Sequence, residues 1–234
     1  MYMPEGRYAG ETARDANAAV RIVQILSHVT LALVVYVNYA RRHWFTASWA
    51  AAGLVSSVMY HVCRADIYCF GCLRDELRKN DHAVQLTLAG AYALELLFLD
   101  CGRETGVAWR VWLPFVATLA VRAYPYQLQS VVLVVLYLAV VAADRFFRLG
   151  ALRLPAAGAY RPRWIGAGAG ILLLALGLYF WPSDARHGDA VADGLVHALW
   201  HVLVGFALMA LTLGVPRVPA PSASLDISLS NRGL

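Results

Sequence analysis

The chain is poor in charged residues and almost devoid of lysine. Charged residues make up 15% of its 234 residues and hydrophobic residues 60%, whereas a soluble domain usually carries about 25% charged residues. Lys79 is the only lysine, so the net charge of +5 comes almost wholly from arginines scattered between apolar segments. This distribution argues against a nucleic-acid-binding protein. It also leaves no polar stretch long enough for a separate soluble domain, and it predicts an all-α, polytopic membrane protein.

The scarcity of lysine and cysteine excludes two further kinds of site. Lys79 lies in a predicted loop, so no helix offers a lysine for a retinal Schiff base. The cysteines are Cys63, Cys69, Cys72 and Cys101, and the first three form C-x5-C-x2-C. No second pair follows that would complete a four-cysteine zinc site. If this loop faces an oxidising compartment, we expect one disulfide among the three, and we expect Cys101 at the opposite membrane face.

Seven apolar runs have the length of membrane-spanning helices, about 17–25 residues. They lie at 22–40, 44–62, 81–100, 106–122, 127–143, 163–181 and 193–214. We therefore expect a seven-helix transmembrane domain over residues 22–215. A polar N-terminal tail at 1–21 precedes it, and a tail at 216–234, rich in Pro and Ser, is expected to be disordered. The N-terminal tail lacks the pattern of a cleavable signal peptide, so the first apolar segment is expected to direct insertion.

Basic residues in the predicted loops favour an N-terminus outside or in a lumen and a cytoplasmic C-terminus. In this orientation 11 of the 20 basic residues lie inside, and the connection after the fifth helix has five arginines, Arg145 to Arg163, against one acid, Asp144. The plasma membrane and the ER or Golgi both fit. The sixth segment contains Gly166-Ala-Gly168-Ala-Gly170, for which packing within the bundle is favoured over a dimer interface, and the oligomeric state stays open.

Three histidines lie inside predicted helices at spacings that let them converge. His61 ends the second helix, while His197 and His201 are four residues apart near the start of the seventh, so their rings share one helix face. An imidazole at membrane depth is costly unless it has a partner. Because the second and seventh helices meet the same membrane face at these positions, the three rings are expected at one depth. Three histidines are the ligand count of one class of catalytic zinc site.

Asp81 and Ser57 belong to the same predicted group. Asp81 opens the third helix at that membrane face, and Ser57 lies one turn from His61 on the same side of the second helix. Beside a Zn2+ held by three histidines, Asp81 is expected to take or orient the proton of a water, and Ser57 to hold that water or a carbonyl. Alternatively, each histidine pairs separately with a neighbouring helix. We interpret the remaining four in that structural way: His28, His43, His82 and His187.

This combination resembles the transmembrane protein 8 and myomaker family, within the superfamily of seven-helix membrane hydrolases that includes alkaline ceramidases and adiponectin-receptor-like (PAQR) proteins. The hallmark is S-x3-H in the second helix, an aspartate in the third and H-x3-H in the last, and it is matched by Ser57, His61, Asp81, His197 and His201. Similar flanking segments are Tyr60-His61-Val62-Cys63, Cys72 followed by Asp75-x5-Asp81, Ala120-Val121-Arg122 and Val215-Pro216-Arg217. The resemblance runs from about residue 23 to residue 217.

The resemblance implies an integral membrane enzyme that uses zinc to hydrolyse an amide or ester bond of a membrane lipid, as a ceramidase or phospholipase A2 does. His61, His197 and His201 would hold Zn2+, Asp81 would act as general base and then acid, and Ser57 would stabilise the tetrahedral intermediate. Membrane lipids would then be both surroundings and substrate. Two alternatives stay open: a non-enzymatic, myomaker-like role in cell fusion or lipid organisation with a structural zinc, and a seven-helix receptor.

Overall fold

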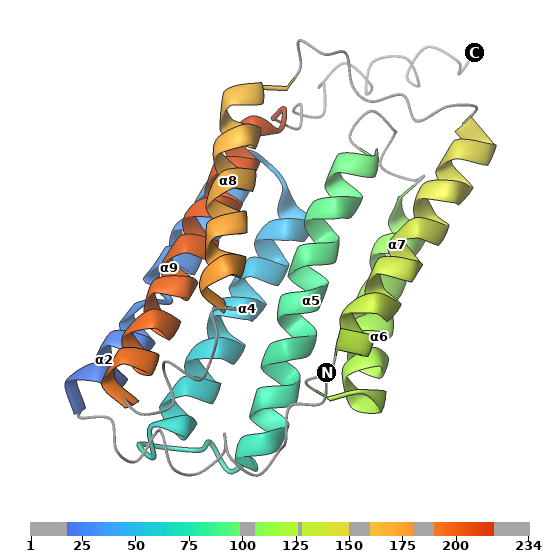
Figure 1. Cartoon of the computed structure of the whole chain (residues 1–234). Helices are drawn as coiled ribbons and strands as arrows, with labels where there is room; N and C mark the ends of the chain where they lie inside the picture. The colour runs from blue at the N-terminus through green and yellow to red at the C-terminus, as the bar shows by residue number, and fades with distance from the viewer. Residues whose placement is uncertain (1–17, 99–105, 126–127, 150–159, 180–189, 218–234) are drawn as a thin grey trace, which may run out of the picture.

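The computed structural model describes residues 18–98, 106–125, 128–149, 160–179 and 190–217, and within these ranges the regular secondary structure is entirely helical. The helices stand side by side with roughly parallel axes (Figure 1). They are α2 (Ala18–Leu26), α3 (Val29–Ala40), α4 (Trp44–Arg64), α5 (Arg74–Phe98), α6 (Val107–Ala123), α7 (Leu128–Leu149), α8 (Pro162–Tyr179) and α9 (Ala190–Gly214). The expected all-α class is confirmed for this part of the chain.

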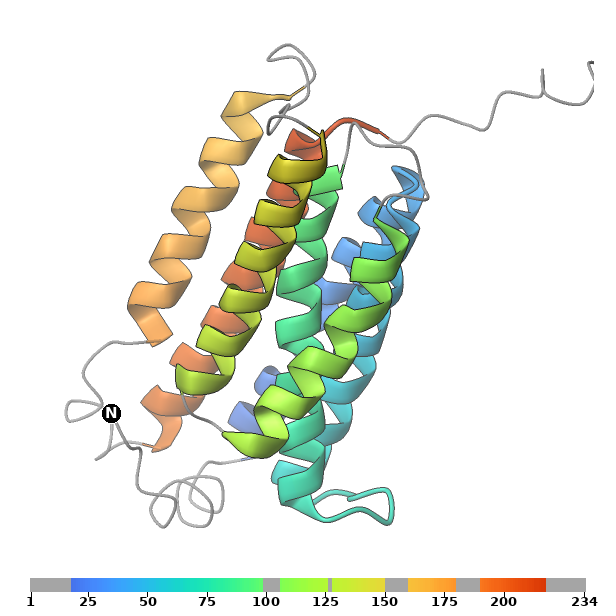
Figure 2. The same cartoon turned by 90° about the vertical axis from the view of Figure 1, so that its right-hand side faces the viewer.

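Helices that follow one another in the chain mostly pack against one another. α3, α4, α5, α6 and α7 contact in that order, and α9 packs against both α8 and the α2–α3 segment. Figure 2 shows α8 at one edge of the bundle, beside α9. Gly168 of α8 allows this approach, because a Cβ there would lie 2.8 Å from Leu211 Cγ and 2.9 Å from the Ala207 carbonyl oxygen of α9. α9 packs against α2, and α2 also contacts α4.

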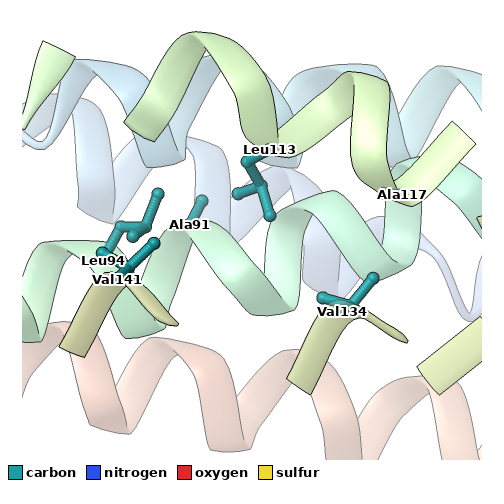
Figure 3. Close-up of a cluster of buried hydrophobic side chains, with 6 residues drawn as sticks. All are labelled: Ala91, Leu94, Leu113, Ala117, Val134 and Val141. Carbon is teal, nitrogen blue, oxygen red and sulfur yellow. The ribbon is translucent and has the colours of Figure 1, made fainter. Parts of the chain in front are cut away.

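Two groups of buried apolar side chains hold the helices together. One joins α5, α6 and α7 through Ala91, Leu94, Leu113, Ala117, Val134 and Val141 (Figure 3). The other joins α3, α4, α5 and α9, and it contains Tyr92. The Tyr92 hydroxyl accepts a hydrogen bond from Asn38 Nδ2 at 2.9 Å, donates to the Leu208 carbonyl at 3.2 Å and lies 2.9 Å from Thr212 Oγ1. This network links α3, α5 and α9 at one point, so it fixes α9 against the other two helices.

The first apolar segment, predicted as one helix over 22–40, is two helices with a break at Ser27 and His28. The His28 amide donates to the Ile25 carbonyl, three residues back, at 3.3 Å, so the regular four-residue ladder is interrupted there. α2 begins at Ala18, so the last residues of the predicted 1–21 tail are helical. Residues 1–17, and the predicted disordered tail from 218 onward, lie outside the described residues.

The predicted helix at 81–100 begins seven residues early, at Arg74, which shortens the predicted 63–80 connection. The added turns are polar. Asp75 and Glu76 lie in the first turn, where carboxylates are favourable at a helix N-terminus, and both pair with Lys79 at i+4 and i+3. The length of an apolar run does not predict polar helical turns that precede it. α7 likewise continues past the predicted end at 143, whereas α4, α6, α8 and α9 agree with the prediction to within three residues.

Within the described ranges, three segments are long and apolar enough to cross a membrane: Ala19–Ala40, Leu128–Phe147 and Val191–Gly214. Pro162–Leu178 is a shorter apolar helix. Large apolar side chains are exposed on several outer faces, among them Tyr36, Leu119, Phe147 and Leu173. An outer surface of this kind is costly in water and ordinary in lipid, so these segments are typical of a protein inserted in a membrane.

A buried ionic group joins α4, α5 and α6 at the end of α4 away from His61. The Glu95 carboxylate lies 3.5 Å from His43 Nδ1 and 3.6 Å from an Arg110 guanidinium nitrogen, and it accepts a 3.4 Å hydrogen bond from Thr46. His43 and Glu95 are both buried. This pairing explains how α6 accommodates Arg110 within an otherwise apolar sequence, because a buried charge requires a partner.

Candidate metal centre

The predicted histidines meet near one end of the bundle, the lower end in Figure 1, where α4 ends and α9 begins. His61 lies in the last turn of α4, while His197 and His201 lie on successive turns near the start of α9. The ring of His61 lies 5.2 Å from that of His197 and 5.1 Å from that of His201, and the two α9 rings are 4.7 Å apart. The structure therefore brings together the three residues that the sequence singled out as metal ligands.

His28, which sequence reasoning left aside, is the fourth member of this cluster. Its ring lies 4.1 Å from the ring of His201 and 4.8 Å from that of His61. The side chains of His28, His61 and His201 offer ligand nitrogens that all lie within 4.8 Å of one another. The sequence held no spacing signal for His28, because it lies at the break between α2 and α3 and has no histidine at helical spacing beside it.

The hydrogen bonds of His28 fix which ring nitrogen carries the proton. Nδ1 lies 2.9 Å from the Gln24 carbonyl oxygen and 3.2 Å from that of Ile25. Carbonyl oxygens only accept hydrogen bonds, so Nδ1 carries a hydrogen, and in the neutral ring Nε2 then carries the lone pair. That Nε2 is buried without a hydrogen-bond partner. A histidine whose second nitrogen is held by a backbone carbonyl is the usual arrangement of a metal ligand.

The donor set fits a zinc ion. His197 Nε2 and His201 Nε2 share a hydrogen bond at 3.0 Å, and two nitrogens bound to a tetrahedral zinc at about 2.0–2.1 Å would be about 3.3 Å apart. His61 is buried, and its Nδ1 has no hydrogen-bond partner. Together with His28 Nε2, two buried ring nitrogens therefore lack partners inside the protein. Buried polar atoms in this condition require an explanation, and a cation bound among the rings would supply it.

Ser57, one helical turn from His61 on α4, forms a second polar group with Asp81 of α5. Ser57 is fully buried, and its hydroxyl donates to Asp81 Oδ1. Ser56 Oγ donates to the same oxygen at 3.3 Å, and Gln85 Nε2 lies 3.0 Å from Ser57 Oγ and 3.4 Å from Asp81 Oδ1. The predicted pair is thus directly hydrogen-bonded, and Ser56 and Gln85 are two unpredicted members, of which Gln85 contacts both partners.

The residue spacing on α4 places the Ser57–Asp81 group next to the histidine cluster along the helix. Gly53, Ser57 and His61 recur every four residues, so they lie along one face of the helix, and all three are buried. A Cβ on Gly53 would approach Gln85 Nε2 to 3.3 Å, so glycine leaves room for the Gln85 amide beside Ser57. Ser57, which holds the Asp81 carboxylate, therefore lies one helical turn from His61, about 5–6 Å along the axis of α4.

Two glycines bracket the histidines of α9 and allow its close approach to α2 and α3. A Cβ on Gly205 would clash with Thr30, and one on Gly194 would clash with Val20 and lie 3.1 Å from Gln24 Nε2. Gln24 Nε2 donates to the Gly194 carbonyl at 3.3 Å. Because Gln24 also anchors the ring of His28, this close contact couples the position of His28 to that of α9.

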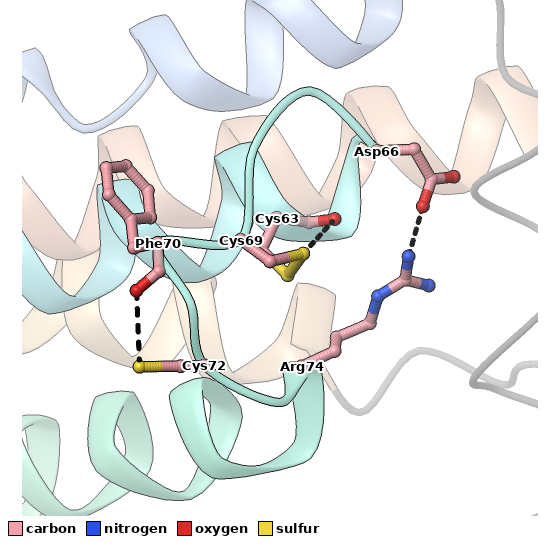
Figure 4. The surroundings of a disulfide bond; sticks show 6 residues. All are labelled: Cys63, Asp66, Cys69, Phe70, Cys72 and Arg74. Atoms are coloured by element: carbon pink, nitrogen blue, oxygen red, sulfur yellow. Dashed lines mark hydrogen bonds and ion pairs between the residues drawn. A yellow bond between two sulfur atoms is a disulfide. The ribbon is translucent and has the colours of Figure 1, made fainter.

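A disulfide closes the loop that follows His61. Cys63 and Cys69 are bonded, while Cys72 is free and exposed (Figure 4). Asp66 pairs with Arg74 across the same loop, and Arg21 of α2 donates to the Ala65 carbonyl at 3.1 Å. One disulfide among the three cysteines was expected, and the structure selects the Cys63–Cys69 pair. The loop is thereby fixed to α2 and to the end of α4 that holds His61.

The other histidines lie apart from this centre. His43 belongs to the ionic group with Glu95. His82 Nε2 lies 3.3 Å from Ser130 Oγ of α7. His187 and Cys101 fall outside the described residues.

Comparison with known proteins identifies a family without assigning a function. A family model described as "Protein of unknown function (DUF3522)" matches residues 16–202. This range includes four members of the histidine cluster as well as Ser57, Asp81 and Gln85. A search of curated proteins gave no match.

Proposed function

The chain belongs to the DUF3522 family, and we propose that it is an integral membrane, zinc-dependent hydrolase that cleaves an amide or ester bond of a membrane lipid. The observation that carries the proposal is the cluster of four imidazole rings from three segments of the chain. His28, His61 and His201 offer ligand nitrogens within 4.8 Å of one another, and two buried ring nitrogens of the cluster lack hydrogen-bond partners. The Asp81 carboxylate is held by the Ser57 hydroxyl, and Ser57 lies one helical turn from His61 on α4.

A seven-helix transmembrane bundle is the arrangement we propose for the membrane. Three segments meet the length and hydropathy of membrane spans, with α2 and α3 counted as one. α4, α5 and α6 contain 21, 25 and 17 residues, which corresponds to about 26–38 Å at 1.5 Å per residue, close to the hydrocarbon thickness of about 30 Å. The polar side chains that lower their hydropathy include Glu95, Asp81 and Gln85, which contact other side chains within the bundle.

His61, His197 and His201 are the residues we propose as zinc ligands. A zinc ion bound in this way supplies an activated water and a Lewis acid for a carbonyl. His28 lies beside the ligands with its Nε2 lone pair free of any hydrogen bond within the protein. We therefore propose that His28 either accepts a proton during the reaction or becomes a fourth ligand, and these two roles predict different outcomes on mutation.

Asp81 is proposed as the general base, with Ser57 and Gln85 as the residues that position it. Three donors converge on its Oδ1, so the orientation of the carboxylate is set before a substrate binds. The Ser57 hydroxyl is already donated to Asp81, so in this arrangement it holds the base. Stabilising an oxyanion, the role expected for Ser57, would require its hydroxyl to rotate toward the substrate.

A lipid substrate fits the position of the site. The histidines lie within about one to three turns of the helix ends at one end of the bundle, and a site near one membrane face suits a lipid whose scissile bond lies near the headgroups. The Cys63–Cys69 disulfide is two residues from His61 and supports an oxidising compartment at this end, either lumenal or extracellular. The proposed orientation is therefore a site facing outward, with the N-terminus on the same side and the C-terminus in the cytoplasm.

A structural zinc in a non-enzymatic membrane protein is the second candidate. The fourth histidine favours it, because structural zinc sites are normally closed by four protein ligands, whereas catalytic sites keep one position for water. In this case His28, His61, His197 and His201 would bind the metal together and join α4 and α9 to the α2–α3 break.

Zinc content and lipid hydrolysis, measured side by side, test both candidates. Purified wild type is expected to contain one zinc per chain and to hydrolyse a member of a panel of ceramides and glycerophospholipids, while His201→Ala loses both. His82→Ala serves as the matched control because His82 lies outside the cluster. Retention of zinc with loss of turnover in His28→Ala would support the hydrolase. Loss of zinc in His28→Ala, with no hydrolysis by wild type, would favour the structural zinc, and a zinc-free folded wild type would contradict both.

A further inference from the structure

Three arginines gather at the end of the molecule opposite the histidines, the upper end in Figure 1, where α9 ends and α8 begins. Arg41 follows α3, Arg161 precedes α8 and Arg217 follows α9. The guanidinium of Arg41 donates to the Val215 carbonyl, and the Arg161 amide donates to the adjacent Gly214 carbonyl at 2.9 Å. The end of α9 therefore serves as a common anchor for cationic residues from three separate segments.

No carboxylate balances this group among the described residues, where none of the three arginines forms an ion pair. Arg41 is partly buried, and its Nε is buried without a hydrogen-bond partner. Burial lowers the pKa of Arg41 from its usual value, and the charges of Arg161 and Arg217 lower it further. Like charges held together in this way disfavour the arrangement unless an anion joins them.

The position of the arginines relative to the membrane spans indicates which anion is available. Ala19–Ala40 ends one residue before Arg41, and Val191–Gly214 ends three residues before Arg217. Tyr39 and Trp44 are both exposed on this end and form an edge-to-face pair with ring centroids 4.6 Å apart. Exposed Tyr and Trp are typical of the membrane–water interface, so the three arginines lie at the depth of lipid headgroups.

We propose that Arg41, Arg161 and Arg217 form a binding site for the phosphate of an anionic phospholipid headgroup. Guanidinium groups suit this ligand, because their planar donors bind phosphate oxygens in pairs. On the proposed orientation this end faces the cytoplasm, where anionic lipids are concentrated. The inference rests on the insertion of the chain in a membrane, and it is independent of zinc and of hydrolysis at the other end.

The test is a lipid titration of the purified full-length chain in non-ionic detergent. A short-chain phosphatidylinositol bisphosphate and a short-chain phosphatidylserine are compared with phosphatidylcholine, and inorganic phosphate and the free inositol phosphate form separate arms. The variant Arg41→Gln/Arg161→Gln/Arg217→Gln is compared with a control of equal net charge at the other end, Arg64→Gln/Arg74→Gln/Arg78→Gln. Zinc content is recorded for every protein, so a failure of the metal centre is distinguished from a failure of this site.

Anionic lipids are expected to bind wild type and the control variant alike. Each arginine is expected to raise the affinity for an anionic lipid about fivefold, so the triple variant should bind that lipid on the order of a hundredfold more weakly. If the triple variant does not fold, neutralising the exposed Arg161 and Arg217 alone should still weaken binding about 25-fold. Equal binding of phosphatidylcholine, an equal loss in the control variant, or equal binding of the free phosphates would each overturn the proposal.

Discussion

Replacing Gly205 with alanine tests whether close helix packing creates the metal centre. A Cβ at this position would clash with Oγ1 and Cβ of Thr30 and lie 3.3 Å from the backbone carbonyl carbon of Thr30. Thr30 is buried, and its hydroxyl is held by the Ser27 and His201 carbonyls at 3.1 and 3.4 Å. A β-branched side chain fixed in this way has little freedom to rotate, so α9 itself must move.

The required movement is large compared with the tolerance of a metal site. Carbon atoms pack at about 3.5–4.0 Å, so α9 must withdraw from α3 by about 1 Å at Gly205. His201 is one turn away on the same helix, whereas metal–ligand distances are held to within about 0.2 Å. Overpacking of this kind costs about 1–3 kcal/mol, which corresponds to a loss of zinc affinity of about 5- to 150-fold if the displacement is transmitted to His201.

The assay compares zinc affinity and thermal unfolding of Gly205→Ala with those of Gly170→Ala, a change of the same kind in α8. No heavy atom lies within 4 Å of a Cβ at Gly170, and alanine is favoured over glycine inside a helix by about 1 kcal/mol. The control should therefore unfold at or above the wild-type temperature with unchanged zinc affinity. If Gly205→Ala behaves like the control, the close approach of α9 to Thr30 does not position the histidines, and our account of the site is wrong.

Three further predictions concern the polar groups. Asp81→Asn keeps the size and an acceptor oxygen but removes the base, so turnover should fall about 10²- to 10⁴-fold with zinc retained; loss of zinc would instead make Asp81 a ligand. Glu95→Gln leaves the charge of Arg110 without its partner inside the bundle, so it should lower the free energy of unfolding by about 3 kcal/mol, and an unchanged unfolding temperature would refute this. The hydrogen bond from Arg122 lowers the pKa of the solvent-accessible Glu76 carboxyl. Glu76 should therefore stabilise the fold at pH values above its unfolded-state pKa. This stabilisation should be lost as the pH falls through the lower folded-state pKa. Thermal unfolding of Glu76→Gln should therefore differ from wild type near neutral pH and converge with it in acid, whereas a pH-independent difference would contradict the argument.

Local patterns in the sequence were sufficient for the helical class and for part of the site. Hydrophobic length identified six of the helices to within a few residues at most of their ends, because the apolar composition of each segment is a local property. The i,i+4 spacing of His197 and His201, and of Ser57 and His61, placed each pair on one helix face for the same reason. The direct hydrogen bond between Ser57 and Asp81 agrees with their predicted proximity.

Only the tertiary structure decided which residues complete the site. His28 joins the cluster because the helix breaks at its position and because glycines at 194 and 205 let α9 approach α2 and α3. Gln85 reaches Ser57 because Gly53 leaves room for its amide on the facing helix. These contacts join residues up to 173 positions apart, from His28 to His201. They depend on where helices cross, and no periodicity within one segment of the chain records that crossing.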